Sequence, residues 1–203
     1  MNDENLNIFK KGNYILMNAA FITDGVIALQ QLSKVQLKYN KRDTDTVVNE
    51  IRDSIVSKYL GYELINVEKH GFDAKKLKSD EYLEVKQCSA SSSSWGATFN
   101  DTNLEKAEAF KDTKLTLALA VWNDATDLLF ICFGQNFNIG LYLEDRIKNR
   151  PDGSRSTQTI SFSQLISKYN FNIFIPNSKS KDDVINLISI NNKNLNFIDK
   201  IRI

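Results

Sequence analysis

Apolar residues at helical spacing mark the first part of the chain. Residues 14–39 predict one long or two short helices on this pattern. Residues 46–60 predict a second amphipathic helix, because Ile51 and Ile55 fall on one side and Gly61 follows as a C-terminal cap.

Short strands are predicted after this helix. Leu64–Val67, Phe72–Leu77 and Glu81–Cys88 show strand patterns separated by turn residues, which indicates a three-stranded meander. Leu115–Trp122 and Leu128–Phe133 are nearly continuous apolar runs of strand length, as expected of strands covered on both faces.

The rest of the chain alternates loops, helices and strands. Ser89–Ser94 predicts a serine-rich loop closed by Trp95 and Gly96, and Thr102 with Glu105 at capping-box spacing predicts a helix through Phe110. The further predicted elements are a helix at 139–148, a loop at 149–153, a strand at 159–162, a short helix at 163–169 and a strand at 172–175. Together these elements predict an α/β protein.

Composition favours one globular domain. The 203 residues are 42% hydrophobic and 25% charged, which suits a chain that buries a full core. A formal net charge of +1 excludes a histone-like binder but leaves room for a nucleic-acid enzyme with local basic groups. We therefore expect a single domain over residues 1–203, with a core at residues 46–134 and a C-terminal region, 176–203, of open role.

Location and metal chemistry are also limited by the sequence. No apolar run approaches the roughly 20 residues that span a bilayer, and a signal-peptide pattern is missing, so we expect a cytoplasmic protein without membrane contact. The single histidine, His70, and two cysteines without CxxC spacing leave carboxylates as the source of any metal ligands.

Two acidic groups and one lysine fall on neighbouring predicted strands. Glu84 and Lys86 are two positions apart in one strand and share a face, and an antiparallel neighbour can bring Asp73 beside Glu84. Two carboxylates in a half-buried sheet are costly unless a cation neutralises them. Mg²⁺ suits this arrangement, since it prefers oxygen ligands and commonly bridges to phosphate.

The order helix, three strands, helix, strand around Asp73 and Glu84-x-Lys86 resembles the PD-(D/E)xK nuclease superfamily, in which type II restriction endonucleases are the best-known small members. The resemblance covers about 75 residues. Phe72 stands where the motif's proline would be, and many members of the superfamily also lack this proline. The resemblance implies a restriction-endonuclease-like αβββαβ core with a mixed central sheet flanked by helices.

The resemblance also implies roles for individual residues. Asp73 and Glu84 would bind the catalytic Mg²⁺, for which Mn²⁺ could substitute, and Lys86 would orient and help deprotonate the attacking water. Many members add a helix glutamate, and Glu50 lies at the matching place in the first core helix, off its apolar stripe. A solvated helix glutamate is the alternative for Glu50.

Polar and basic residues near these positions are candidate DNA contacts. Lysines that follow Asp73 could meet phosphates, and two later arginines could read guanines. The segment from Ser91 to Asn100, predicted as a loop, offers hydroxyls, an amide and one indole. These candidates are Lys75, Lys76, Lys78, Gln87, Ser91, Ser92, Trp95, Thr98, Asn100, Arg150 and Arg155. A core aromatic is an equal alternative for Trp95, and a solvated turn for the lysines.

The leading hypothesis is therefore a Mg²⁺-dependent type II restriction endonuclease that cuts double-stranded DNA, as a homodimer whose two-fold symmetry matches two-fold sites. A DNA repair or phage-associated nuclease of the same superfamily uses the same residues. A non-catalytic DNA-binding domain on this fold is the alternative from another class.

Overall fold

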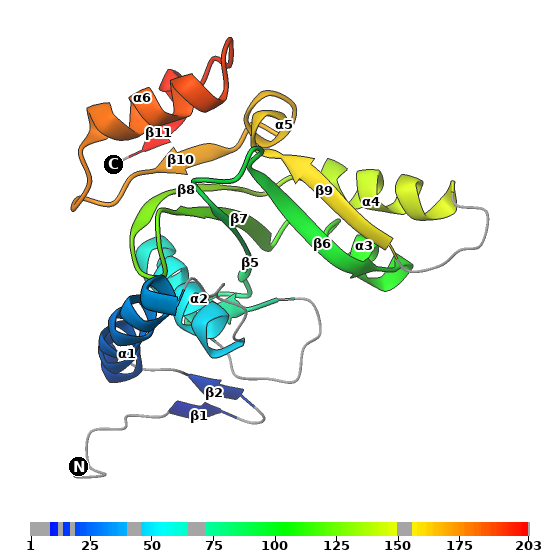
Figure 1. The fold of residues 1–203 in the computed structure, drawn as a ribbon. Helices are drawn as coiled ribbons and strands as arrows, with labels where there is room; N and C mark the ends of the chain where they lie inside the picture. The colour runs from blue at the N-terminus through cyan, green and yellow to red at the C-terminus, as the bar shows by residue number, and fades with distance from the viewer. Residues whose placement is uncertain are drawn as a thin grey trace.

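A seven-stranded mixed sheet forms the centre of the protein in the computed structural model (Figure 1). From edge to edge its strands are β11 (Ile201–Arg202), β10 (Asn172–Phe174), β8 (Leu128–Gly134), β7 (Leu115–Trp122), β5 (Tyr82–Ser89), β4 (Ala74–Lys75) and β3 (Glu63–Leu64). The β5–β7 and β10–β11 pairs are parallel, and the other pairs are antiparallel. The predicted α/β class with a mixed central sheet is confirmed.

The structure describes residues 9–11, 14–16, 19–39, 46–64, 72–149 and 156–202. Its helices are α1 (Ala19–Tyr39), α2 (Thr46–Leu60), α3 (Leu104–Ala109), α4 (Asn138–Lys148), α5 (Phe162–Ser167) and α6 (Lys181–Asn191), with a 3₁₀ turn at Ile198–Lys200. Two small antiparallel sheets complete the fold: β1 (Phe9–Lys11) with β2 (Tyr14–Leu16), and β6 (Gly96–Thr102) with β9 (Ser156–Ser161).

The chain order α2-β3-β4-β5-α3-β7 gives the predicted αβββαβ arrangement, with β6 inserted between β5 and α3. The first two strands of the predicted meander are short, since β3 and β4 pair over only two residues each. Residues 65–67 of the first predicted strand lie outside the described residues.

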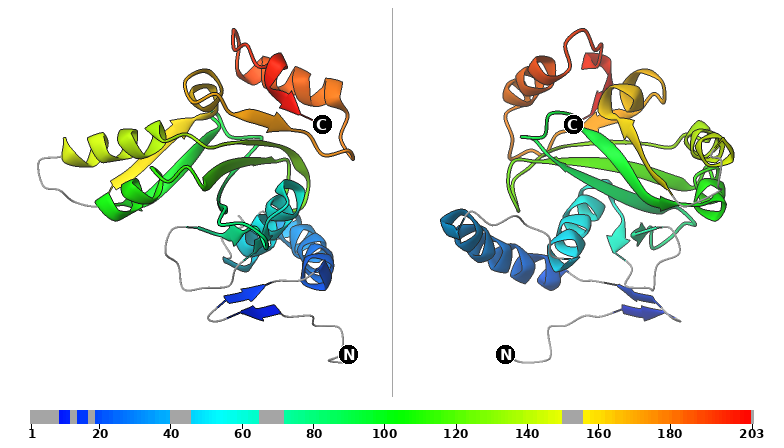
Figure 2. Two further views of the ribbon diagram at one scale, coloured as in Figure 1. Left: turned by 180° about the vertical axis from the view of Figure 1, so that it is seen from behind. Right: turned by 45° about the vertical axis from the view of Figure 1, so that its right-hand side comes forward.

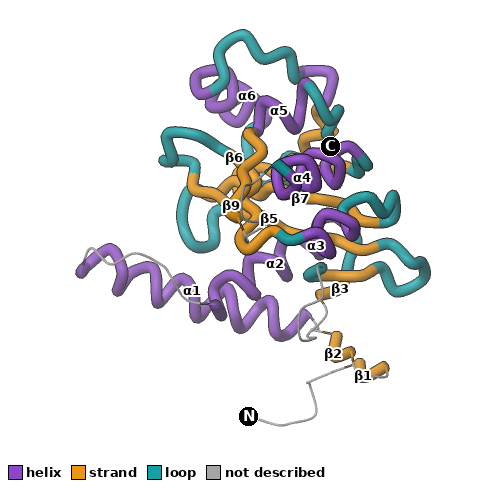
Figure 3. Tube along the Cα trace, turned by 90° about the vertical axis from the view of Figure 1, so that its right-hand side faces the viewer, coloured by secondary structure: helices purple, strands orange, loops and turns teal. Residues whose placement is uncertain are grey.

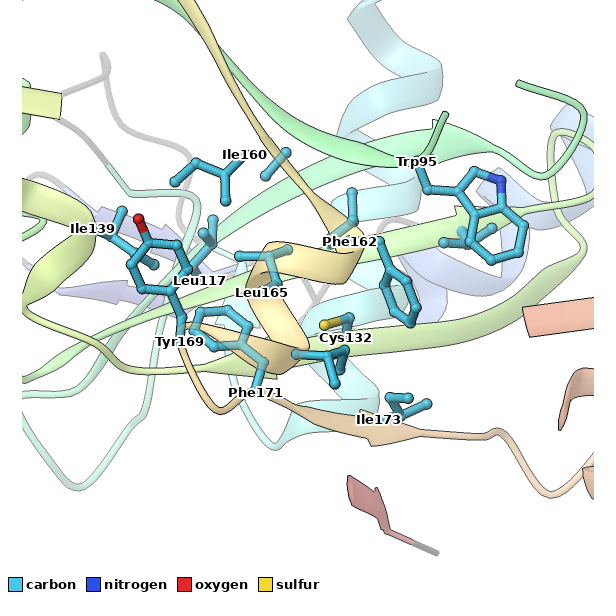
Figure 4. Packing of buried hydrophobic residues seen from close by; sticks show 14 of the residues in the cluster. Trp95, Leu117, Cys132, Ile139, Ile160, Phe162, Leu165, Tyr169, Phe171 and Ile173 are labelled. Carbon is cyan, nitrogen blue, oxygen red and sulfur yellow. The ribbon is translucent and has the colours of Figure 1, made fainter. Parts of the chain in front are cut away.

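The helices lie on both sides of the central sheet. Helices α1 and α2 lie on one side, and the two-stranded β6–β9 ribbon lies on the other with α5 (Figure 2). On the ribbon side, one continuous apolar cluster includes Trp95, Phe162 and Phe171 (Figure 4). On the α2 side, a smaller cluster includes Val56 and Trp122.

Residues 14–39 were predicted as one or two helices, but this segment begins with a strand, β2, before the helix α1. Tyr14–Leu16 pairs with Phe9–Lys11, and α1 then continues through Gly25 without a break. A Cβ at Gly25 would approach the Ile51 side chain to 2.9 Å, so the missing side chain allows the close contact of α1 with α2. Figure 3 shows the two helices on the same side of the sheet.

The segment after the serine loop is a strand, which corrects its prediction as a loop. Ala97 and Phe99 are buried while Thr98 and Asn100 are exposed, so the segment has the two-residue period of a half-buried strand. Its partner β9 pairs Thr98 with Thr159, 61 positions away in the sequence.

The helix after β6 begins later than predicted. The hydroxyl of Thr102 donates to the carbonyl of Phe99 at 3.0 Å and is buried, so Thr102 closes the irregular end of β6. Asn103 caps α3 instead, because its side-chain oxygen accepts from the backbone N–H of Lys106 at 2.8 Å.

Candidate active site

The β4–β5 pairing places Asp73 opposite Glu84. Ala74 pairs with Leu83 and Lys75 with Tyr82, so the next step along the two strands brings Asp73 level with Glu84. The backbone N–H of Asp73 donates to the carbonyl of Leu83 at 2.8 Å, which fixes this register. The juxtaposition of the two carboxyl residues expected from the sequence is therefore present.

The backbone ladder between β4 and β5 ends at this point. The N–H of Val85 donates to Oδ2 of Asp73 at 2.8 Å, so a carboxylate takes the place of a strand carbonyl. Among the described strands, β5 from Val85 to Ser89 pairs only with β7. This leaves a sheet edge next to the two acidic residues.

Glu84 and Lys86 form an ion pair on one face of β5. The pair is largely buried, since Glu84 is 5% exposed and the side chain of Lys86 is 18% exposed. The Lys86 ammonium also lies 5.7 Å from the centroid of the Phe99 ring in β6. A charged pair at this depth is stable only when both charges have partners, and here each supplies the other.

The electrostatics of the pair keep Lys86 charged. Burial acts to lower the pKa of Lys86, but the Glu84 and Asp73 carboxylates outweigh it and raise the pKa above its usual value. Burial raises the pKa of Glu84, and the Lys86 ammonium partly offsets that rise. Lys86 is therefore a cation at neutral pH, which suits orienting a water or a phosphate oxygen rather than accepting a proton.

A third carboxylate, Asp53 of α2, belongs to the same group and was missed by the sequence reasoning. Its Oδ1 accepts from Nε2 of Gln87 at 2.5 Å, and the same nitrogen donates to the carbonyl of Asn49 at 3.2 Å. Burial and the charge of Asp73 raise the pKa of Asp53 well above its usual range. Gln87 thus holds α2 to β5 beside the acidic residues.

The helix acid predicted from the sequence was Glu50, whose side chain lies outside the described part of the structure. Asp53 follows Glu50 by one helical turn, so it lies on the neighbouring part of the same helix surface. The sequence did carry a signal for Asp53. It lies one turn from Glu50, and Ser54 and Ser57 follow it in α2, so this part of the helix offers polar groups for a contact with the sheet.

The carboxyl oxygens of Asp73 and Glu84, with Asp53 close by, are the kind of donor that a hard divalent cation prefers. These carboxyl groups interact electrostatically with one another and with the ammonium of Lys86. In the described part of the chain, no three Asp, Glu, His or Cys side chains are arranged as a complete metal site. Mg²⁺ needs less than that, because it binds through one or two carboxylates together with water and substrate phosphates.

Two of the three predicted lysine contacts are paired with acidic side chains. Lys76 donates to Glu81 at 2.6 Å, and Lys75 approaches Asp80 at 3.4 Å, in the turn that joins β4 to β5. These ion pairs hold the hairpin together at the end away from Asp73. Lys78 is exposed in the same turn.

Trp95 is a core residue, so its prediction as a DNA contact is wrong, and Gln87 is held by α2. Trp95 is 4% exposed and packs edge-on against Phe130 and Phe162, with its indole N–H donating to the carbonyl of Ala90 at 3.2 Å. The Gln87 amide is held by α2, and its Oε1 is buried without a partner in the described structure. Trp95 therefore does not reach the surface, whereas Gln87 is partly exposed but has its amide nitrogen bound to α2.

Other predicted contacts lie at the surface. Thr98 and Asn100 are exposed on the outer face of the β6–β9 ribbon, where the Thr98 and Thr159 hydroxyls are 3.2 Å apart. Ser91 is exposed and bonds to the Ser89 hydroxyl at 2.8 Å, and Ser92 is partly exposed. The predicted contacts Arg150 and Arg155 lie outside the described residues, as does His70.

Comparison of the chain with protein-family profiles and with characterised proteins finds no match. A search of the described helices finds none that combines the length and apolar character of a membrane span.

Proposed function

We propose that this protein is a metal-dependent endonuclease of the PD-(D/E)xK superfamily, acting on double-stranded DNA in the manner of type II restriction enzymes. One observation carries the proposal: Asp73 faces Glu84 where the β4–β5 ladder ends, with Lys86 paired to Glu84 at the same sheet edge. The surrounding α2-β3-β4-β5-α3-β7 order supports it, since that is the core the superfamily resemblance implies.

The residues have separable roles in this proposal. Asp73 and Glu84 would hold Mg²⁺, with Mn²⁺ as a substitute, and each uses one oxygen in the hydrogen bonds to Val85 and Lys86, leaving the other for a metal. Bound Mg²⁺ would lower the pKa of the attacking water and neutralise charge on the phosphoryl oxygens. The charged Lys86 would orient that water for in-line attack. Asp53 would place a third carboxyl group next to the metal ligands.

The outer face of the β6–β9 ribbon is the proposed surface for the DNA grooves. Thr98, Asn100, Thr157 and Thr159 are exposed on this face, so it offers hydroxyl and amide groups. Uncharged donors and acceptors of this kind suit base edges, which carry the sequence information. Lys78, Ser91 and Ser92 would contact phosphates. Two copies of the chain would supply one active site for each DNA strand.

Digestion of plasmid DNA tests the proposal. Mg²⁺ or Mn²⁺ should support cleavage, excess EDTA should stop it, and Ca²⁺ should support binding with little turnover because its looser ligand shell positions the water poorly. A discrete band pattern supports a restriction enzyme, whereas a smear or nicking supports a non-specific or repair nuclease. Full cleavage in EDTA would contradict the metal mechanism.

The variant Asp73→Asn is the sharpest control for this test. The asparagine carbonyl can still accept from Val85 N–H, so the strand junction keeps its hydrogen bond while the charge is lost. Cleavage should fall below detection while the unfolding midpoint stays close to that of the wild type. Wild-type cleavage by the folded variant would remove Asp73 from the site, and DNA binding without any cleavage by the wild type would favour a non-catalytic binding domain.

A further inference from the structure

A second lysine, Lys106 of α3, lies on the ribbon side of the candidate active site. Its ammonium donates to the carbonyl of Asn100 at 3.3 Å, directly after Phe99, whose ring lies under the Lys86 ammonium. Its backbone N–H is held by the Asn103 cap at 2.8 Å. The backbone of β6 and the first turn of α3 thus fix the position of the Lys106 side chain.

Lys106 also acts on Glu84 through its charge. Its ammonium is one of the two lysine charges that lower the pKa of Glu84, the other being the paired Lys86. The two lysines differ in exposure, because the Lys86 side chain is largely buried, whereas Lys106 is partly exposed and its contact with Asn100 lies at the surface. Of these two lysines, Lys106 is therefore the one on the solvent side of the site.

A phosphodiester that enters a site lined by carboxylates needs positive charge on the side from which it approaches. Lys86 is poorly placed for that task, since its side chain is largely buried beside Glu84. The outer face of β6, which would meet the grooves, continues through Asn100 to the contact with Lys106. Backbone and groove contacts would then be made by one continuous segment.

We propose that Lys106 binds a phosphate of the DNA strand that is cut, next to the scissile bond, and so positions that strand over Asp73 and Glu84. This inference rests on the proposed nuclease function and adds a binding residue to it. The role is one of positioning by charge. It therefore requires a cation at residue 106 but no particular proton transfer.

Salt dependence of DNA binding tests this role. Binding of Lys106→Met and wild type to labelled linear plasmid DNA in Ca²⁺ would be measured over a range of NaCl concentrations. A lost phosphate contact should reduce the slope of log affinity against log salt by about 0.9 and weaken binding most at low salt. Lys106→Arg should restore the slope. Lys193→Met, which removes an exposed lysine near the C-terminus, should leave it unchanged.

Single-turnover cleavage in Mg²⁺ and thermal unfolding complete the test. Lys106→Met should need more protein to reach the same rate, with its unfolding midpoint close to that of the wild type. An unchanged salt slope, or a lowered unfolding midpoint that Lys106→Arg does not reverse, would assign Lys106 a purely structural role at Asn100. A wild type that cuts no DNA would overturn the proposed function itself, whereas a cutting wild type with an unaffected variant overturns only this inference.

Discussion

The two faces of the central sheet are packed in different ways. On the ribbon face, large rings meet edge to face: Trp95 lies 5.4 Å from Phe130 and 5.8 Å from Phe162, centroid to centroid. On the α2 face, β7 presents Ala118 and Ala120, and the helix packs on them through Val56. The ribbon face therefore buries more apolar surface, which is the main source of folding free energy.

Unsatisfied polar atoms follow the same division. Within the described structure, the buried side-chain atoms without a hydrogen-bond partner are Ser57 Oγ, Gln87 Oε1 and Trp122 Nε1. All three belong to α2 or to side chains on the α2 face. A buried polar group without a partner costs about 1–3 kcal/mol. The comparison indicates that the ribbon face stabilises the fold, whereas the α2 face gives up stability where it carries Asp53 to the candidate site.

The largest effect should appear at the sheet edge between the two faces. Lys86→Met should lower the single-turnover cleavage rate by roughly two to four orders of magnitude, because the variant loses the charge that orients the attacking water. DNA binding in Ca²⁺ should change far less. An unchanged rate would mean that Lys86 serves only as the ion-pair partner of Glu84 and has no role in cleavage.

Glu84 requires a control in that experiment, because removal of Lys86 leaves its carboxylate buried without a partner. Lys86→Gln keeps a hydrogen-bond donor for Glu84 without the charge. If cleavage is lost in both variants and Lys86→Gln unfolds like the wild type, the loss belongs to the chemistry and not to the fold.

The next prediction compares how much the packing on each face of the sheet contributes to the free energy of unfolding. Phe130→Ala on the ribbon face should lower the free energy of unfolding by about 3–5 kcal/mol, through lost burial and the cavity that remains. Val56→Ala on the α2 face removes two methyl groups and should cost about 2 kcal/mol. Urea unfolding measures both changes. Equal losses would contradict the asymmetry between the faces.

A smaller effect concerns the pH dependence of stability. The pKa of Asp53 is higher in the folded protein than in the unfolded chain, because of burial and the charge of Asp73. Stability should therefore fall as the pH rises from the unfolded pKa, about 3.9, through the folded pKa. Asp53→Asn keeps the acceptor for Gln87 but removes the charge, so it should be more stable than wild type at pH 7.

The gain from Asp53→Asn should vanish in acid, below the pKa of the unfolded carboxyl, where the aspartic acid is neutral in both states. Urea unfolding across a pH series checks the sign. A variant less stable than wild type at neutral pH would show that the Asp53 charge is stabilised in the fold.

The smallest effects compare two serines. Ser57→Ala removes a buried hydroxyl without a partner and should raise the free energy of unfolding by up to about 1 kcal/mol. Ser161→Ala removes the N-cap of α5, whose capping box pairs Ser161 with Gln164, and should lower it by about 1 kcal/mol. Opposite signs support the division between the faces, and equal signs contradict it.

Local pattern was sufficient for much of the core. The helix at residues 46–60 and the buried strand at 115–122 match α2 and β7 in their bounds, because helical spacing and a continuous apolar run are properties of the segments themselves. The neighbourhood of Asp73 and Glu84 could also be predicted, since a short turn joins their strands and an antiparallel pair follows from it.

Contacts between distant segments could not be predicted in this way. The alternation of Trp95, Ala97 and Phe99 follows a serine-rich run and was not enough to predict a strand. This segment is a strand because it pairs with β9, which lies far along the chain. Asp53 and Lys106 lie on helices, where several faces are polar, and only packing against the sheet decides which face points to the site.

The sequence by itself therefore determined the order of the core elements α2-β3-β4-β5-α3-β7, the acidic pair and the lysine beside it, because these depend on periods of two and 3.6 residues and on one short turn. Tertiary structure alone decided that Trp95 is in the core, that Gln87 holds α2 through Asp53, and that Lys106 meets the end of β6. The physical reason is that the rotation of a helix on a sheet is set by packing of all its neighbours, which no single segment encodes.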